Sequence, residues 1–156
     1  MVETATLEIG QLAPDFRLKG PGGQPISLSE YRGRNNVVLV FYPLAFSPVC
    51  SHQLPMIDQA MARITARGGV VLGVSVDSHY ANTAFAERLS LGFPLLSDFK
   101  RQVSAAYGVL TEEAGVSGRA VFLVDRQGRI AYRDMSPTLT EIPDIEALIT
   151  ALEGLK

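Results

Sequence analysis

The chain has 156 residues, with 14 basic and 16 acidic side chains and a formal net charge of −2, and 47% of it is hydrophobic. This length suits one domain with a sizeable core, so we expect residues 1–156 to form a single domain. The charge leaves no broad cationic surface for phosphate backbones, and no apolar run reaches the roughly 20 residues that span a bilayer. We therefore expect neither a nucleic-acid nor a membrane partner. Residues 1–8 contain two acidic side chains and lack the apolar core of a secretory signal.

Buried strands and amphipathic helices alternate in the first half of the chain. The unbroken apolar run at residues 37–42 is typical of a strand covered on both faces. After a loop at 43–49, apolar residues recur at steps of three and four from about 48 to 67, which predicts an amphipathic helix ended by two glycines. A second buried strand is expected at 70–76. Other patterns predict a short strand at 14–18 and a helix at 80–89.

The second half predicts a strand whose proline suits a sheet edge or a strand start, then a short helix, a β-hairpin and a final helix. We expect these elements at residues 93–98, 102–107, 120–133 and 143–152. The order βαβαβ, followed by a hairpin and a helix, indicates a three-layer α/β sandwich. In this fold a central mixed sheet carries helices on both faces.

The single cysteine, Cys50, lies where the loop after the first buried strand meets the first turn of the helix. Active sites of open α/β sheets collect at that edge, and the free N–H groups of a helix N-terminus stabilise a thiolate. The alternative is a structural cysteine, because free Cys is among the most buried residue types. Position alone does not separate these interpretations. One cysteine and two isolated histidines exclude an intrachain disulfide and disfavour a metal site, so we expect no cofactor and a reducing, cytoplasmic location.

The residues before the cysteine resemble the signature of the peroxiredoxins, which is a Pro, three residues, Thr or Ser, two residues and Cys. They read Pro43-Leu44-Ala45-Phe46-Ser47-Pro48-Val49-Cys50. The resemblance continues in the same order over nearly the whole chain, at residues 13–16, 41–43, 75–78, 93–98 and 119–125. Residues 41–47 and the lone cysteine are most similar to the one-Cys group named for alkyl hydroperoxide reductase E. The resemblance implies a thioredoxin-like fold and thiol-dependent reduction of hydrogen peroxide and organic hydroperoxides.

The resemblance also implies roles for four residues. Cys50 attacks a peroxide oxygen and becomes a sulfenic acid, while donors stabilise the charge that grows on the departing oxygen. Ser47 donates to the thiolate or the peroxide, Pro43 shields the pocket from water, and Arg119 holds the peroxide from the start of a neighbouring strand. Each of the last three has a structural alternative: Ser47 as a helix N-cap, Pro43 as an ordinary loop proline and Arg119 as a surface arginine.

Leu44, Phe46 and Val49 are expected at the rim of the pocket, where apolar side chains suit organic hydroperoxides. The backbone N–H groups of Val49 and Cys50 are further donors, since Pro48 has none. Without a second cysteine, the sulfenic acid must be resolved by an external thiol or by a thioredoxin- or glutaredoxin-like protein. The resemblance implies a homodimer formed through the loops that flank the active site.

The sequence departs from the family pattern at three positions. Ser47 replaces the Thr of many members and keeps the hydroxyl. Gln53 replaces a Glu that usually helps to hold the arginine, so it can accept a hydrogen bond but carries no charge. Pro55 predicts either a kink just after the cysteine or a helix whose regular part begins near Pro55. His52, two residues from the nucleophile, does not face it on a helix and is not expected to act as its base.

Two other classes of function remain open from the sequence. One is a redox sensor or binding module on the same fold, in which Cys50 signals without turnover. The other is a thiol–disulfide oxidoreductase, which the absence of a Cys-x-x-Cys pair disfavours.

Overall fold

The apolar run predicted as a buried strand forms β3 (Asn36–Phe41), which lies inside a seven-stranded sheet. The structure is a computed structural model that describes residues 7–136 and 144–155. The strand order is β2-β1-β5-β4-β3-β8-β9. β3, β4 and β5 run parallel, whereas β8 is antiparallel to β3, so the predicted mixed sheet is confirmed. The other strands of the sheet are β1 (Arg17–Lys19), β2 (Pro25–Ser27), β4 (Gly69–Ser75), β5 (Leu95–Ser97), β8 (Ala120–Val124) and β9 (Ile130–Met135).

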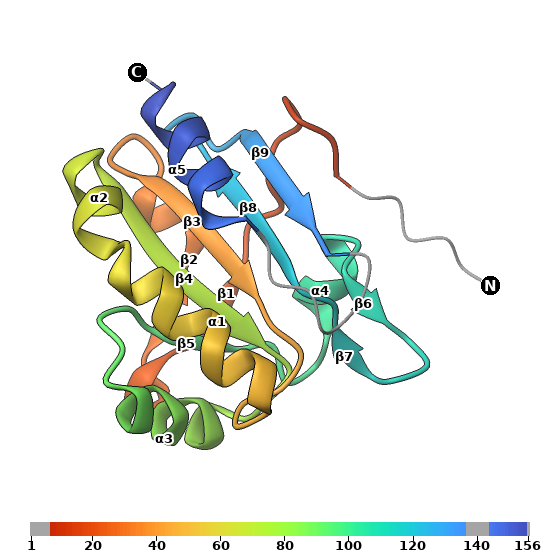
Figure 1. Cartoon of the computed structure of the whole chain (residues 1–156). Coiled ribbons are helices and arrows are strands. Elements are labelled where there is room, and N and C mark those ends of the chain that lie inside the picture. Colours follow the sequence, from red (N-terminus) through yellow and green to blue (C-terminus); the bar gives the residue numbers. More distant parts are fainter. Residues whose placement is uncertain (1–6, 137–143, 156) are drawn as a thin grey trace.

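Helices cover both faces of this sheet, because side chains alternate between the two faces along each buried strand. Val38 and Val40 of β3 pack with residues of α1, α2 and α5, which lie in front of the sheet in Figure 1. Val37 and Leu39 pack instead with residues of α4 and of the N-terminal segment. The helices are α1 (Pro48–Gln59), α2 (Met61–Ala66), α3 (His79–Leu89), α4 (Gln102–Ala106) and α5 (Ile145–Glu153), with 3-10 turns η1 (Pro21–Gly23) and η2 (Leu28–Tyr31).

The helix predicted from about residue 48 to 67 is divided into α1 and α2, which are separated by Ala60. α1 continues through Pro55, so the alternative in which the regular helix begins near Pro55 is wrong. The final helix begins after Asp144, whose side chain accepts a hydrogen bond from the Ala147 N–H at 3.2 Å. Pro143, which we expected in its first turn, lies outside the described residues.

Two strand predictions need correction. β5 lies between β1 and β4, so Pro94 precedes an internal strand: the strand-start interpretation is confirmed and the edge interpretation is wrong. The strand predicted at 14–18 begins only at Arg17, as β1 (Arg17–Lys19), and its partner β2 was not predicted. The hairpin of β8 and β9 is confirmed, but a second small hairpin precedes it, formed by β6 (Leu110–Thr111) and β7 (Val116–Ser117). This small hairpin leads directly into the segment that carries Arg119.

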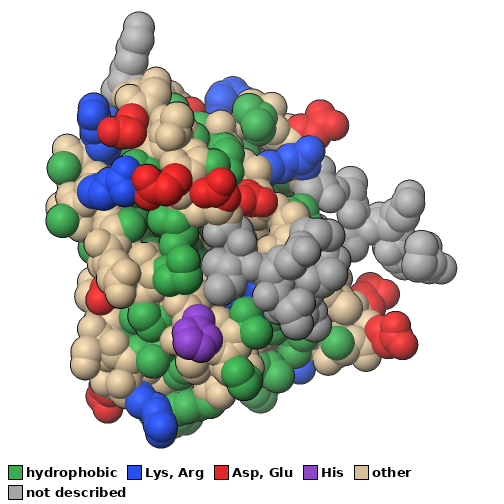
Figure 2. Space-filling model, viewed as in Figure 1, with side chains coloured by type: hydrophobic (Ala, Val, Ile, Leu, Met, Phe, Trp, Pro, Cys, Tyr) green, Lys and Arg blue, Asp and Glu red, His purple; other side chains and the backbone are tan. Residues whose placement is uncertain are grey.

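Charged side chains gather over α2 and α5, where Figure 2 shows neighbouring blue and red groups. Ion pairs join these helices, at 2.7 Å between Arg63 and Glu146 and at 3.4 Å between Arg67 and Glu153. All four side chains are exposed, so solvent screens both pairs and they add little to stability. Within the described ranges, no helix has the length and apolar character needed to cross a bilayer.

Candidate active site

Cys50 lies in the first turn of α1, immediately after the loop that leaves the carboxyl end of β3. Its side chain is fully buried, with 0% exposure, in the apolar cluster beneath α1. Pro48 occupies the first helical position and has no N–H, so Val49 and Cys50 contribute the first free backbone donors of the helix. The sulfur therefore lies at the positive end of the helix dipole, as the sequence predicted.

Arg119 directly precedes β8, the strand next to β3, and reaches the sulfur from there. β8 pairs antiparallel with β3, so Ala120 lies opposite Phe41 and the start of β8 adjoins the loop before Cys50. The hydroxyl of Ser117 donates to the carbonyl of Tyr42 at 3.0 Å. The segment before Arg119 is therefore hydrogen-bonded to the start of the loop that leads to Cys50. Arg119 is 3% exposed, so the interpretation as a surface arginine is wrong.

One nitrogen of the Arg119 guanidinium donates hydrogen bonds to two side chains. Its Nη1 lies 3.1 Å from the sulfur of Cys50 and 2.7 Å from Oε1 of Gln53. Gln53 is fully buried one turn after Cys50 on α1. A guanidinium always carries its charge and only donates hydrogen bonds, so the sulfur of Cys50 lies against a fixed, positively charged donor.

The loop between Phe41 and Pro48 is held by Asp77, a contact that the sequence did not predict. Oδ2 of Asp77 accepts the N–H of Ala45 at 2.8 Å and the hydroxyl of Ser75 at 2.7 Å. The hydroxyl of Ser97 donates to the backbone carbonyl of Asp77 at 2.6 Å. The sequence feature that could have indicated this contact is the position of Asp77 just after β4, because the ends of adjacent parallel strands lie at one edge of the sheet.

A buried polar pair supports the start of the same loop. The phenol of Tyr42 donates to Oδ1 of Asn82 at 2.6 Å, and Nδ2 of Asn82 donates to the carbonyl of Leu96 at 3.2 Å. Burial raises the pKa of Tyr42 well above its usual value of 10.0, and the nearby Asp77 carboxylate adds to this effect. The phenol therefore remains a neutral donor at physiological pH.

Phe46 has a backbone φ of +66°, which is uncommon for a residue with a side chain. Its ring packs on Phe85 of α3, with centroids 4.9 Å apart, although nearly half of the side chain remains exposed. Leu44 is also exposed and Val49 is half-buried, so each of the three predicted rim residues has some exposed surface.

Ser47 and Pro43 lie in the loop as expected, but the contacts of Ser47 differ from the prediction. Its hydroxyl donates to the carbonyl of Leu44 at 2.9 Å, and it makes no side-chain cap for α1. The residue is the N-cap by position, and its carbonyl accepts the N–H of Ser51 at 3.0 Å. Pro43 is buried, and the side chain of His52 is exposed.

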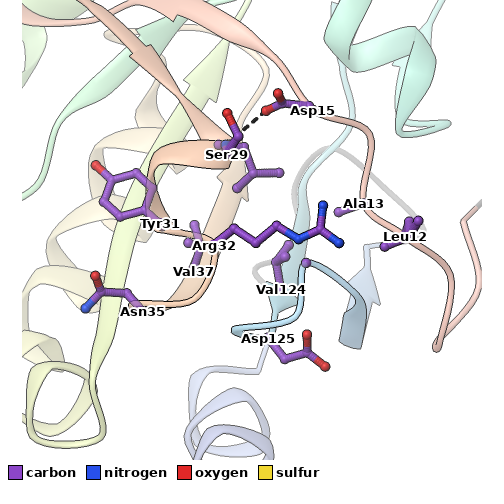
Figure 3. A pocket seen from close by; sticks show the side chains of 12 residues that line it. Leu12, Ala13, Asp15, Ser29, Tyr31, Arg32, Asn35, Val37, Val124 and Asp125 are labelled. Carbon is purple, nitrogen blue, oxygen red and sulfur yellow. Dashed lines mark hydrogen bonds between the residues drawn. The ribbon is translucent and has the colours of Figure 1, made fainter.

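A cavity of about 120 Å³ lies at the opposite end of the sheet, between the start of β3 and the end of β8. Figure 3 shows Arg32 extended across it, between Val37 and Val124 on one side and Ala13 on the other. The Asp15 carboxylate at its rim accepts the N–H groups of Phe16 and Ser29 at 2.8 and 3.0 Å, as a turn residue does. The lining contains no cysteine, and we assign the thiol chemistry to the Cys50 end of the sheet.

The fold and the site together define a thiol-based redox protein: a thioredoxin-like sheet, with a cysteine at a helix N-terminus held against an arginine. In the described part of the chain, no group of three or more His, Cys, Asp or Glu side chains could hold a metal ion.

Comparison with known proteins identifies the family. A model of the AhpC/TSA family matches residues 9–133. Alkyl hydroperoxide reductase E of Mycobacterium tuberculosis is 39% identical over 131 residues, which cover 83% of this chain and 86% of that protein. The chain belongs to the AhpC/TSA family.

Solved structures agree with this assignment and confirm the expected peroxiredoxin fold. The crystal structure of Enterococcus faecalis AhpC has a TM-score of 0.86 at 29% identity, covering 93% of this chain and 90% of that one. A peroxiredoxin-like protein from Aquifex aeolicus has a TM-score of 0.88 at 26% identity, covering 97% and 90%.

Proposed function

We propose that this chain is a thiol-dependent peroxidase that reduces hydrogen peroxide and organic hydroperoxides at Cys50. Membership of the AhpC/TSA family supports the proposal, and the observation that carries it is the 3.1 Å contact between Arg119 and the sulfur. The thiolate attacks the terminal oxygen of the peroxide, an S–O bond forms and the O–O bond breaks. The cysteine becomes a sulfenic acid, and the departing hydroxide or alkoxide takes a proton from water.

Donors around the sulfur stabilise the charge that moves to the departing oxygen. In this proposal Arg119 and the N–H groups of Val49 and Cys50 are the principal donors. The Ser47 hydroxyl joins them by rotating away from the Leu44 carbonyl, because a hydroxyl has one hydrogen to donate. Pro43 and the rim of Leu44, Phe46 and Val49 limit water and favour apolar peroxides.

The resolving step needs an external reductant, because the chain contains one cysteine. A first thiol attacks the sulfenic sulfur and releases water, which leaves a mixed disulfide at Cys50. A second thiol then releases the enzyme thiol and forms the reductant's disulfide. We propose a low-molecular-weight thiol or a thioredoxin- or glutaredoxin-like protein for this part, in a reducing cytoplasm.

The reductant must reach a sulfur that is fully buried in this structure, so the first turn of α1 has to open. Pro55 supports this step. It has no N–H for the carbonyl of Ser51, which weakens the helix one turn beyond the cysteine.

We propose a homodimer formed through the same edge of the sheet. Leu44, Phe46, Tyr80 and Phe99 follow the carboxyl ends of β3, β4 and β5, and all four apolar side chains are exposed. Tyr80 is 76% exposed and Phe99 64%. Contact between two such edges would cover apolar surface that a monomer leaves in water.

Peroxide consumption tests the proposed function. The reduced protein is mixed with hydrogen peroxide or a fatty-acid hydroperoxide, with an excess of small thiol or of thioredoxin. Continuous consumption supports the peroxidase. A single stoichiometric burst with every reductant would support a redox sensor in its place.

A further inference from the structure

A groove lined by basic side chains lies beyond the carboxyl ends of β4 and β5, between β1, the start of α3 and the loop after β5. Its volume of about 530 Å³ is enough for a small organic molecule. Three exposed cations line this cationic groove: Arg17, Lys19 and Lys100. Among the described residues, none of the three has a partner in an ion pair.

The charge of the cationic groove is opposite in sign to that of the protein. Its lining contains one acidic side chain, Asp98, so three positive charges and one negative charge leave a formal charge of +2 with His79 neutral. Asp98 is 1% exposed, and its carboxylate accepts the N–H groups of Val103 and Ser104 at 3.1 and 2.6 Å. It therefore offsets little of the positive charge on the solvent side. The whole chain has a formal net charge of −2.

Two hydrogen bonds connect the cationic groove to the loop before Cys50. The hydroxyl of Ser97, which lines the groove, donates to the carbonyl of Asp77 at 2.6 Å. The carboxylate of Asp77 accepts the N–H of Ala45 at 2.8 Å. The groove and the loop are therefore neighbours at one edge of the sheet. Exposed charges act over about 10 Å at 0.1 M ionic strength, so these cations act on charged molecules that approach the cysteine.

We propose that the cationic groove attracts low-molecular-weight thiols that carry carboxylates and steers them to the sulfenic acid of Cys50. This inference rests on the proposed function, which requires an external thiol. Arg and Lys side chains only donate hydrogen bonds, so carboxylates suit them as acceptors. Tyr80 and Phe99 also line the groove, but the steering depends on the cations and not on exposure of these two rings.

Steering raises the rate of encounter and leaves the chemistry of the resolving step unchanged. The thiol sulfur attacks the sulfenic sulfur, an S–S bond forms and the S–O bond breaks. The departing hydroxide takes the proton of the thiol and becomes water. The product is a mixed disulfide between Cys50 and the small thiol.

Charge reversal at two of the cations tests the steering. The groove variant combines Arg17→Glu with Lys100→Glu. The control combines Arg34→Glu with Arg88→Glu, which changes the net charge by the same amount at exposed residues that do not line the groove. Each protein is oxidised with one equivalent of hydrogen peroxide. Formation of the mixed disulfide is then timed with mercaptosuccinate, which is negative, with uncharged 2-mercaptoethanol and with positive cysteamine.

Each thiol is compared between proteins, so its intrinsic reactivity cancels. At low salt we expect mercaptosuccinate to react about tenfold more slowly with the groove variant than with the wild type. Cysteamine reacts faster with the groove variant, 2-mercaptoethanol keeps its rate, and the control behaves as the wild type. Salt at about 1 M shortens the screening length to about 3 Å and removes the difference. Equal losses of rate with mercaptosuccinate and 2-mercaptoethanol, or the same loss in the control, would overturn the proposal.

Two further measurements keep the test decisive. If the groove variant does not fold, the wild-type rate with mercaptosuccinate is measured against salt: a decrease supports steering, and a rate independent of salt overturns it. If the wild type forms no sulfenic acid, the proposed function fails, and alkylation of the Cys50 thiol still reports the field of the groove. We expect the groove variant to lower the rate with negative iodoacetate relative to uncharged iodoacetamide. An unchanged ratio overturns the proposal.

Discussion

Nη1 of Arg119 lies 3.1 Å from the sulfur of Cys50, although 69 residues separate them in the chain. The antiparallel pairing of β8 with β3 creates this contact, because it brings the start of one strand beside the end of the other. Both residues are buried, so solvent screens the interaction between them little.

Arg119→Ala removes a charged donor from the sulfur and from the bound peroxide. We expect the second-order rate constant with hydrogen peroxide to fall about 10²–10³-fold. Arg119→Lys restores only part of this rate, since an ammonium lacks the planar fork of a guanidinium. Stopped-flow kinetics measure both variants, and a wild-type rate in Arg119→Ala would remove this residue from the site.

Asp77→Ala removes the acceptor of the Ala45 N–H and loosens the loop before Cys50. We expect the peroxide rate to fall roughly tenfold, as the loss of one hydrogen bond to a charged group allows. Asp58→Ala is the control, because the Asp58 carboxylate accepts the Gly92 N–H at 2.8 Å in another loop. It is expected to lose stability and keep its rate. Equal losses of rate in the two variants would contradict the assigned role.

Two buried tyrosines make the protein sensitive to alkali. Burial raises the pKa of both Tyr42 and Tyr107 above 10.0, and Tyr107 donates to the Pro14 carbonyl at 2.6 Å. Above pH 10 the unfolded chain releases these protons while the folded chain keeps them, so stability falls as the pH rises. The slope is about 1.4 kcal/mol per pH unit for each tyrosine.

Urea unfolding between pH 9 and pH 11 measures this slope, and Tyr107→Phe is expected to reduce it by one tyrosine's share. An unchanged slope in Tyr107→Phe would show that this phenol does not contribute.

The sequence predicted the sheet, its helices and the position of Cys50, because apolar periodicity and turn residues are local signals. It did not predict the Ala45–Asp77 contact or the hydroxyl of Ser47 on the Leu44 carbonyl. These depend on how the ends of separate strands meet in space. The short strands β2, β6 and β7 were missed because none of them lies in an apolar run long enough to show a period.

Hydrogen exchange tests whether the first turn of α1 opens. We expect the amides of residues 48–58 to exchange faster than those of β3, because Pro55 removes one hydrogen bond from this helix. Pro55→Ala restores the missing donor and should slow their exchange. Strong protection across residues 48–58 in the wild type would argue against opening as the route to the buried sulfur.

The most direct test of the account follows Cys50 itself through one turnover. Reduced protein is mixed with one equivalent of hydrogen peroxide in the presence of dimedone, and the modified residue is identified by mass spectrometry. We predict rapid loss of peroxide and a dimedone adduct at Cys50, with neither in Cys50→Ser, whose fold is retained. Undiminished peroxide consumption by Cys50→Ser, or a wild type that keeps its full free thiol after peroxide, would contradict the single-thiol mechanism.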